Sequence, residues 1–324
     1  MNFITKPNLF VFLLLINLFS IHAFSQEQYF EVYNTSNSPI ANDNIKALFY
    51  DNSKLWVGTN GNGIDIIDNE NKWQHYDIFN SGLRDDYVNV IRIDKNKVKW
   101  IGTAFEGLVK YNDTTWTSFN VENSSLPFNS INDIFFKDNK VMIATEAGLA
   151  TFDEKTNKWQ NVFDNEDEYL DIKKIKEDFT TNNIWVLSPF ALNYLKDNKW
   201  TTLELPKKIK SSLTSMDIDA NGTLFVGSFN TGLHTYNNKQ QWQEFKFNKQ
   251  INNSVISILI SSNILFIGTN GYGLAIYNMN TNDFKIYNLE NSNIPNNWIY
   301  DISTDNDNNV WIATSKGIAK LKIK

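Results

Sequence analysis

A short phrase, an aromatic or aliphatic strand that leads into a glycine turn, returns seven times along this chain. Its copies are Leu55–Thr59, Lys99–Thr103, Val141–Thr145, Ile184–Ser188, Leu224–Ser228, Leu265–Thr269 and Val310–Thr314. The second residues of these copies lie at positions 56, 100, 142, 185, 225, 266 and 311, so neighbouring copies are 40 to 45 residues apart. A repeat of this length that contains only strand signals is typical of the blade of a β-propeller. The spacing therefore predicts seven blades.

The second repeat shows how one blade is built. Residues 88–93 are expected to form the innermost strand a, 98–103 strand b, 108–111 strand c and 115–119 strand d. Each run is short, rich in β-branched and aromatic residues, and bounded by Asn, Asp or Gly, which favour turns. We therefore predict an all-β fold, a seven-bladed propeller with four-stranded antiparallel blades. Its repeat cores lie near residues 55–68, 99–112, 141–153, 184–196, 224–237, 265–278 and 310–323.

The outer strand of the last blade is missing from the C-terminal end of the sequence. An aromatic residue marks strand d in six repeats: Trp73, Trp116, Trp159, Trp200, Trp242 and Phe284. Residues 28–39 repeat the pattern of residues 283–295, which include one of these strands. We expect the N-terminal strand to complete blade seven, because closing the ring removes two exposed sheet edges.

The first 25 residues differ from the rest of the chain. Lys6 precedes an apolar run over residues 9–19, and Ala23 and Ser25 are small residues in the spacing of a cleavage site. This layout predicts a secretory signal peptide over residues 1–25, and the run is short for a membrane span. We expect one propeller domain over residues 26–324, without membrane insertion after cleavage.

Composition excludes several classes of function. The chain has no cysteine and a formal net charge of −6, and its basic residues are not gathered into one stripe, which argues against nucleic-acid binding. His75 and His234 belong to different repeats, so neither a metal site nor a cofactor is expected. Residues 217–222 and 305–307 resemble the start of a calcium-binding loop but lack its later ligands, and we interpret both as a–b turns.

The phrase Leu-Trp-Val-Gly-Thr-Asn-Gly-Asn-Gly at residues 55–63 and the linkers at 123–127 and 291–295 carry a family resemblance. They resemble the two-component regulator propeller repeat. The resemblance covers the chain after residue 25 and is weakest in blade four. It implies the periplasmic sensing part of bacterial hybrid sensor kinases, many of which respond to oligosaccharides. The sequence has one propeller and neither a membrane helix nor a kinase after it, so the resemblance implies binding but neither catalysis nor phosphorelay.

The repeats also serve as controls for one another at the position before strand a. Small or polar residues occupy this position in five blades: Asn44, Ser130, Asp171, Ser212 and Ser254. Tyr87 and Trp298 occupy it in the other two, although packing there does not require an aromatic residue. Flat aromatic faces with a polar edge suit a sugar ring or the apolar anchor of a partner protein. Tyr87 and Trp298 are therefore candidate ligand contacts, with the capping of the ring as the structural alternative.

The b–c loops vary within the repeated frame, and in a propeller they share one face with the d–a linkers around the channel mouth. Further candidate ligand contacts on these loops are Phe105, Glu106, Glu146, Phe190, Phe229, Asn230, Asn270, Tyr272 and Lys316. Binding residues are often placed on such loops, although loops also vary because little constrains them. A ligand site at the channel mouth is the interpretation that this variation favours.

Two charged loops precede blades four and five. Residues 166–168 with Asp171 are acidic, and Lys207, Lys208 and Lys210 are basic. A polarised patch of this kind steers charged partners, but charge runs more often face solvent. We interpret both as solvated loops.

The function predicted from these observations is an exported, periplasmic or secreted, non-catalytic propeller. Its partner is expected to be an oligosaccharide or an envelope protein. One alternative is a polysaccharide lyase or hydrolase that uses Glu106 and Glu146, because glycosidases need two carboxylates. A second alternative is a structural adaptor in an envelope assembly.

Overall fold

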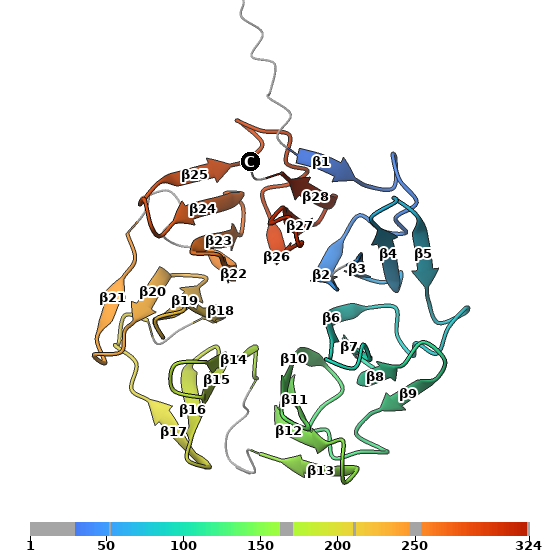
Figure 1. Cartoon of the computed structure of the whole chain (residues 1–324), viewed down its shortest axis with the longest axis horizontal. Helices are drawn as coiled ribbons and strands as arrows, with labels where there is room; N and C mark the ends of the chain where they lie inside the picture. Colours follow the sequence, from blue (N-terminus) through green and yellow to red (C-terminus); the bar gives the residue numbers. More distant parts are fainter. Residues whose placement is uncertain (1–29, 52, 163–170, 210–211, 247–253, 323–324) are drawn as a thin grey trace, which may run out of the picture.

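The computed structural model describes residues 30–51, 53–162, 171–209, 212–246 and 254–322. Seven four-stranded antiparallel sheets stand around a central axis, as Figure 1 shows in the view down the ring. The predicted fold class, a seven-bladed β-propeller, is confirmed. No helix in the described part of the chain is long and apolar enough to cross a bilayer.

Each blade contributes one strand to each of four concentric layers. The innermost strands a are β2 (Ile45–Tyr50), β6 (Val88–Ile93), β10 (Ile131–Lys137), β14 (Lys174–Asp178), β18 (Leu213–Ile218), β22 (Val255–Ser261) and β26 (Ile299–Thr304). The strands b are β3 (Lys54–Thr59), β7 (Lys99–Thr103), β11 (Lys140–Thr145), β15 (Asn183–Ser188), β19 (Leu224–Ser228), β23 (Ile264–Thr269) and β27 (Val310–Thr314). The strands c are β4 (Ile64–Asp68), β8 (Leu108–Tyr111), β12 (Gly148–Asp153), β16 (Ala191–Lys196), β20 (Gly232–Tyr236), β24 (Leu274–Asn278) and β28 (Gly317–Leu321). The outer strands d are β5 (Trp73–Tyr76), β9 (Trp116–Phe119), β13 (Lys158–Asn161), β17 (Lys199–Leu203), β21 (Trp242–Glu244), β25 (Phe284–Tyr287) and, in blade seven, β1 (Phe30–Tyr33).

The N-terminal strand closes the ring as predicted. β1 pairs antiparallel with β28, with Phe30 opposite Leu321 and Tyr33 opposite Ile318 (Figure 1). Phe30 is buried, and its ring makes an edge-to-face contact with Tyr287 of blade six at 5.4 Å between centroids. The first described strand of the chain is therefore held both by its own blade and by the neighbouring blade.

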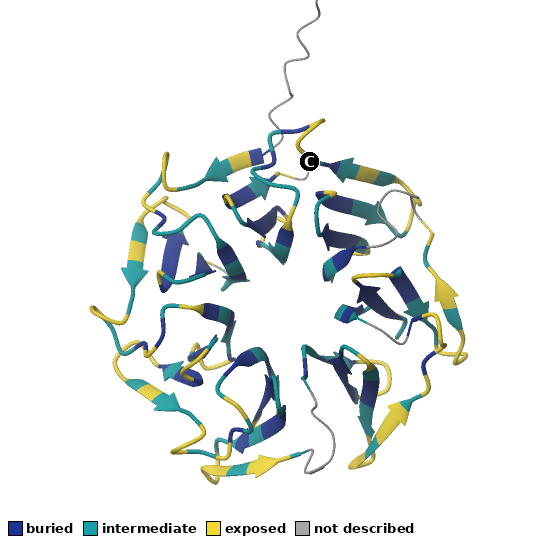
Figure 2. Cartoon of the chain, turned by 180° about the vertical axis from the view of Figure 1, so that it is seen from behind, coloured by how far each residue is buried: buried dark blue, intermediate teal, exposed yellow. Residues whose placement is uncertain are grey.

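The strands b are almost continuously buried because other blades or strands cover both of their faces (Figure 2). Close approach explains the small residue near the end of the repeated phrase. A Cβ atom on Gly102 would lie 2.6 Å from side-chain carbons of both Val90 and Ile131, so a larger residue does not fit. Trp100 is fully buried, and its indole Nε1–H donates to Asp94 in the a–b turn at 3.2 Å.

Neighbouring blades pack through four equivalent side chains, which we call the interface quartet. One blade supplies the second residue of the repeated phrase and the residue three positions after its strand-d marker. The next blade supplies one strand-c residue and its own strand-d marker. By blade pair, the quartets are Trp56, Tyr76, Tyr111 and Trp116 (1/2); Trp100, Phe119, Phe152 and Trp159 (2/3); Met142, Val162, Leu195 and Trp200 (3/4); Trp185, Leu203, Tyr236 and Trp242 (4/5); Phe225, Phe245, Tyr277 and Phe284 (5/6); Phe266, Tyr287, Leu321 and Phe30 (6/7); and Trp311, Tyr33, Ile67 and Trp73 (7/1).

Polar side chains on the strands a link the blades around the channel. Asp301 of blade seven accepts a hydrogen bond from the Leu48 N–H of blade one at 2.9 Å. Asp133 of blade three accepts one from the Ile175 N–H of blade four at 3.0 Å. In blade five the equivalent residue, Ser215, accepts the N–H of the next blade through its hydroxyl oxygen. These bonds satisfy backbone groups that the strand pairing within a blade leaves free.

Candidate functional site

The strand order of a blade places its connections at two ends. Strands a and c run one way and strands b and d the other, so the b–c loops and the d–a linkers lie together at one end. We call this end the channel-mouth face. The a–b and c–d turns lie at the opposite end. All eleven candidate ligand contacts therefore fall on the channel-mouth face.

Tyr87 and Trp298 occupy equivalent places in blades two and seven. The residue after each pairs with the last residue of strand b, Val88 with Thr103 and Ile299 with Thr314. The two residues are 42% and 47% exposed, so both are accessible to a ligand. Each residue also forms an isolated bridge to the b–c loop of the preceding blade.

Blade two presents a pair of aromatic rings. Tyr87 and Phe105 contact edge to face at 5.5 Å between centroids, and Phe105 is 63% exposed. The buried carboxylate of Asp85 fixes this pair, because its two oxygens accept the N–H groups of Tyr87 and Phe105, both at 2.9 Å. The Tyr87 ring also lies over Gly61, where a Cβ atom would come within 3.2 Å of it. The backbone of both residues is thus fixed while the residues remain exposed.

Blade seven has a similar arrangement around Trp298. The Asn296 side chain accepts the Trp298 N–H at 2.8 Å, and Asn270 forms the bridge from blade six. The indole lies beside Gly271, and Tyr272 on the same loop is 46% exposed. Glycine at position 271 therefore allows the indole to lie close to the loop that carries Tyr272.

A polar side chain with an oxygen that has no hydrogen-bond partner lies on the blade between those of Tyr87 and Trp298. Asn44 holds the equivalent position in blade one, which stands between blades seven and two. Its side-chain oxygen is buried and has no hydrogen-bond partner. The neighbouring Asn42 amide donates to Asn62 at 2.8 Å and to the Asn60 carbonyl at 3.2 Å. Sequence reasoning counted Asn44 only as a small or polar residue and did not single it out.

The other predicted contacts are spread around the ring. Phe190 of blade four is 63% exposed, and Phe229 of blade five is 43% exposed. Asn230 is also exposed, and its amide donates to the Ser212 hydroxyl at 3.0 Å. Lys316 of blade seven is exposed. The structure therefore groups Tyr87 with Phe105, and Trp298 with the loop that carries Asn270 and Tyr272. The remaining candidates are spread over other blades.

Glu106 and Glu146, the carboxylates of the enzyme alternative, lie on adjacent blades. Glu106 is exposed on its loop, with its N–H bonded to the Thr103 hydroxyl. The Glu146 carboxylate accepts a hydrogen bond from the Ser130 hydroxyl at 2.9 Å. Among the described residues no hydrogen bond or ion pair joins the two acids, and neither lines a described cavity.

Exposed apolar side chains gather on the channel-mouth face. In the described part of the chain, twelve large apolar side chains are exposed: Ile78, Phe79, Tyr87, Phe105, Val121, Phe128, Phe179, Phe190, Phe229, Tyr272, Leu289 and Trp298. Eleven of them lie on b–c loops or d–a linkers, and Phe179 alone lies on an a–b turn. Exposed apolar groups concentrated on one face indicate a binding surface, whereas scattered ones need no explanation.

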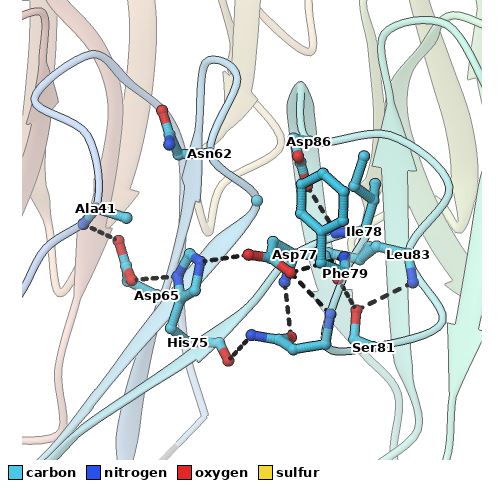
Figure 3. Close-up of polar contacts among 12 residues, drawn as sticks. Ala41, Asn62, Asp65, His75, Asp77, Ile78, Phe79, Ser81, Leu83 and Asp86 are labelled. Carbon is cyan, nitrogen blue, oxygen red and sulfur yellow. Dashed lines mark hydrogen bonds and ion pairs between the residues drawn. The ribbon is translucent and has the colours of Figure 1, made fainter.

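A polar cluster around His75 holds part of this face in place (Figure 3). His75 Nδ1 lies 2.8 Å from Asp65 of strand β4, and its Nε2 lies 3.4 Å from Asp77 of the next linker. Asp65 is buried and accepts the Ala41 N–H at 2.8 Å; burial raises the pKa of this carboxyl, while the bonds from Ala41 and His75 oppose the shift. Asp77 in turn accepts the N–H of Phe79, which is 89% exposed. The signal that sequence reasoning missed is Asp65 itself, a charged residue within an apolar strand.

The calcium-like segments form a–b turns. Asp219 accepts the N–H groups of Asn221 and Thr223, and Asp305 accepts those of Asp307 and Asn309. Of the charged loops, Asp171 pairs with Lys173 at 2.7 Å, and the side chains of Lys207 and Lys208 are exposed. Residues 166–168 and Lys210 lie outside the described residues, as does the signal peptide predicted over 1–25.

A comparison with protein families places the resemblance on one repeat. Residues 293–316 match the two component regulator propeller. This confirms the predicted resemblance to that repeat. The matched segment runs from the linker that carries Trp298 through strands β26 and β27 to Lys316. A search of curated proteins gave no significant match.

Solved structures share the fold at low sequence identity. The extracellular domain of a protein described as a hybrid two component system from B. thetaiotaomicron matches 91% of this chain with a TM-score of 0.76 and 18% identity. Virginiamycin B lyase from Staphylococcus aureus matches 91% of the chain and 99% of its own, with a TM-score of 0.74 and 13% identity. PorZ, a surface component of the type-IX secretion system of Porphyromonas gingivalis, matches 90% with a TM-score of 0.71 and 14% identity. The chain spans 42% of the first protein and 48% of PorZ. At these identities the shared property is the fold.

Proposed function

We propose that this protein is an exported recognition module of the sensor-propeller type that binds its partner on the channel-mouth face. The concentration of eleven of the twelve exposed large apolar side chains on this face carries the proposal. Exposed aromatic groups keep apolar surface in contact with water and gain no packing in the core. Their concentration at one end of the ring therefore favours contact with a partner. The sensor-type propeller fold and the predicted signal peptide support a periplasmic or secreted location.

The centre of the site is expected on blades seven, one and two. Trp298 and Tyr87 are two half-exposed aromatic residues, and Asn44 lies between them with a side-chain oxygen that is buried and has no hydrogen-bond partner. A ligand that fits has flat apolar surface at two points and polar groups between them. An oligosaccharide or the aromatic-rich edge of an envelope protein has this chemistry.

The test compares the double variant Tyr87→Ala/Trp298→Ala with Phe179→Ala, which removes the one exposed aromatic side chain on the opposite end of the described ring. The purified proteins are probed with an array of soluble oligosaccharides and by cross-linking to an envelope fraction. We expect binding by the wild type and by Phe179→Ala and at least about tenfold weaker binding by the double variant. The melting temperatures of all three proteins should agree closely, because the changed side chains are exposed. Equal binding by the double variant overturns the proposal.

A further inference from the structure

The interface between blades three and four departs from the other six. In those six interfaces, three or four of the four quartet residues are aromatic. Between blades three and four only Trp200 is aromatic, and the other members are Met142, Val162 and Leu195. At the Leu195 position four of the other quartets hold a larger aromatic residue, and two hold the aliphatic Ile67 and Leu321; the aromatic residues are Tyr111, Phe152, Tyr236 and Tyr277.

A groove opens where these smaller side chains stand. It has a volume of about 730 Å³, and all four quartet members line it. Its mouth lies among the a–b turns of both blades and the c–d turn of blade four, at the end of the ring opposite the channel-mouth face. A groove of about 380 Å³ lies at the equivalent place between blades one and two, whose quartet is fully aromatic. The smaller quartet residues therefore enlarge the groove between blades three and four, which is separate from the surface proposed above.

The walls of the groove are polar and electrically balanced. Its charged lining residues are Lys137, Lys140, Lys196, Asp138, Asp153 and Asp197, three of each sign. Amide side chains also line it, among them Asn139, Gln160 and Asn183. Amides hydrogen-bond both the N–H and the C=O of a peptide group, and balanced charges match a segment without strong net charge.

We propose that this groove binds a polypeptide segment of low net charge and receives one aromatic side chain of that segment against Met142, Leu195 and Trp200. At the Met142 position all six other interfaces hold an aromatic ring, and at the Leu195 position four of the six do. An inserted aromatic side chain buries roughly 150–250 Å² and supplies the anchor typical of such contacts. The aromatic residues at the other interfaces define the side chain that the groove receives, and the balanced charges at its mouth define the low net charge of the segment.

The experiment uses saturation-transfer NMR on the full protein with N-acetyl-tryptophanamide as the probe and maltose as a sugar probe. N-acetyl-leucinamide is the aliphatic control. Leu195→Tyr and Met142→Trp each place in the groove a residue type that other quartets hold at the same position. Phe179→Ala is the matched control, because Phe179 is exposed on the same end of blade four but does not line the groove.

We expect saturation of the indole protons by the wild type and Phe179→Ala, little for the leucine amide, and binding about tenfold weaker in both filled variants. The filled variants should melt at or above the temperature of the wild type, because they add buried apolar surface. If one of them fails to fold, the other gives the result.

Four outcomes overturn the proposal: no indole signal in the wild type, equal signals for the two amides, an unchanged signal in a folded filled variant, or saturation of maltose but not of the indole. The last would assign the groove to sugars. Since the groove and the channel-mouth face lie at opposite ends, Tyr87→Ala/Trp298→Ala should leave the indole signal unchanged, and the two proposals fail independently.

Discussion

The carboxylate of Asp133 offers a sharp test of how the blades are joined around the channel. Its side chain is 3% exposed and contacts two groups: Arg92 Nη2 of blade two at 2.9 Å and the Ile175 N–H of blade four at 3.0 Å. Replacement by alanine leaves that backbone N–H buried without an acceptor, which costs about 1–3 kcal/mol. The Arg92 side chain is 25% exposed, so water partly solvates its charge after the ion pair is lost. The total cost of Asp133→Ala therefore lies near the low end of the roughly 3–5 kcal/mol expected when a buried ion pair is broken.

We therefore expect Asp133→Ala to lower the free energy of unfolding by about 3 kcal/mol, or the melting temperature by about 6–12 °C. The chain supplies its own control at the equivalent position of blade five, where Ser215 accepts the N–H of Ile258. Asp133→Ser should keep that backbone bond and lose only the ion pair, at about half the cost. Circular dichroism melts of the three proteins give the comparison. A loss below about 0.5 kcal/mol in the alanine variant, or equal losses in both variants, refutes the reasoning.

The same residue gives a pH dependence. Burial alone would raise the pKa of the Asp133 carboxyl, but the charges of Lys174 and Arg92 and the bond from Ile175 together lower it. Since the folded pKa lies below the unfolded value of about 3.9, the stabilisation is present above that pH and is lost as the pH falls through the folded pKa. The difference in melting temperature between wild type and Asp133→Ala should thus persist at pH 5 and shrink only below about pH 4. Its disappearance by pH 5 contradicts the assigned contacts.

Two further changes test the closure of the ring and the geometry of the b–c loops by thermal unfolding. Phe30→Ala removes a buried ring from the closing strand and should cost about 3–5 kcal/mol, whereas the exposed Glu31→Ala should cost less than about 1; equal melts would argue against closure by β1. Gly107→Ala forces a side chain into a conformation with φ of 89°, with its Cβ 2.2 Å from the Phe119 carbonyl oxygen, and should cost about 2 kcal/mol or more. In blade four the equivalent residue is Ala191, which lacks a positive φ, so Ala191→Gly should cost only about 0.5–1 kcal/mol, and a neutral Gly107→Ala would show that the loop relaxes.

The fold was predictable because each blade repeats the same local pattern. The closure by β1 followed from the likeness of residues 28–39 to 283–295, and it required no knowledge of contacts. Strand pairing within a blade joins neighbouring segments, so the alternation of hydrophobic runs and turns was enough to locate the strands.

The candidate site was predictable only in part, because its contacts join different blades. The sequence identified Tyr87 as unusual for its position, but its packing over Gly61 depends on how blade one meets blade two. The carboxylate of Asp85, which accepts the N–H groups of Tyr87 and Phe105, joins a linker to a b–c loop that lies 20 residues further along the chain. His75 was judged in isolation, although its partner Asp65 lies opposite it on the neighbouring strand of the same blade. A charged residue inside an apolar strand is the local signal that points to such a pair.

The chain departs from its own repeat in two opposite directions. At the channel mouth, Tyr87 and Trp298 are aromatic where other blades have small or polar residues, and both residues remain exposed. Between blades three and four, Met142 and Leu195 stand where most of the other interfaces have aromatic rings. The smaller side chains bury less apolar surface between the blades. Neither departure increases the stability of the propeller by packing. Both are explained if the exposed rings and the groove meet partners, and the two binding experiments examine each departure separately.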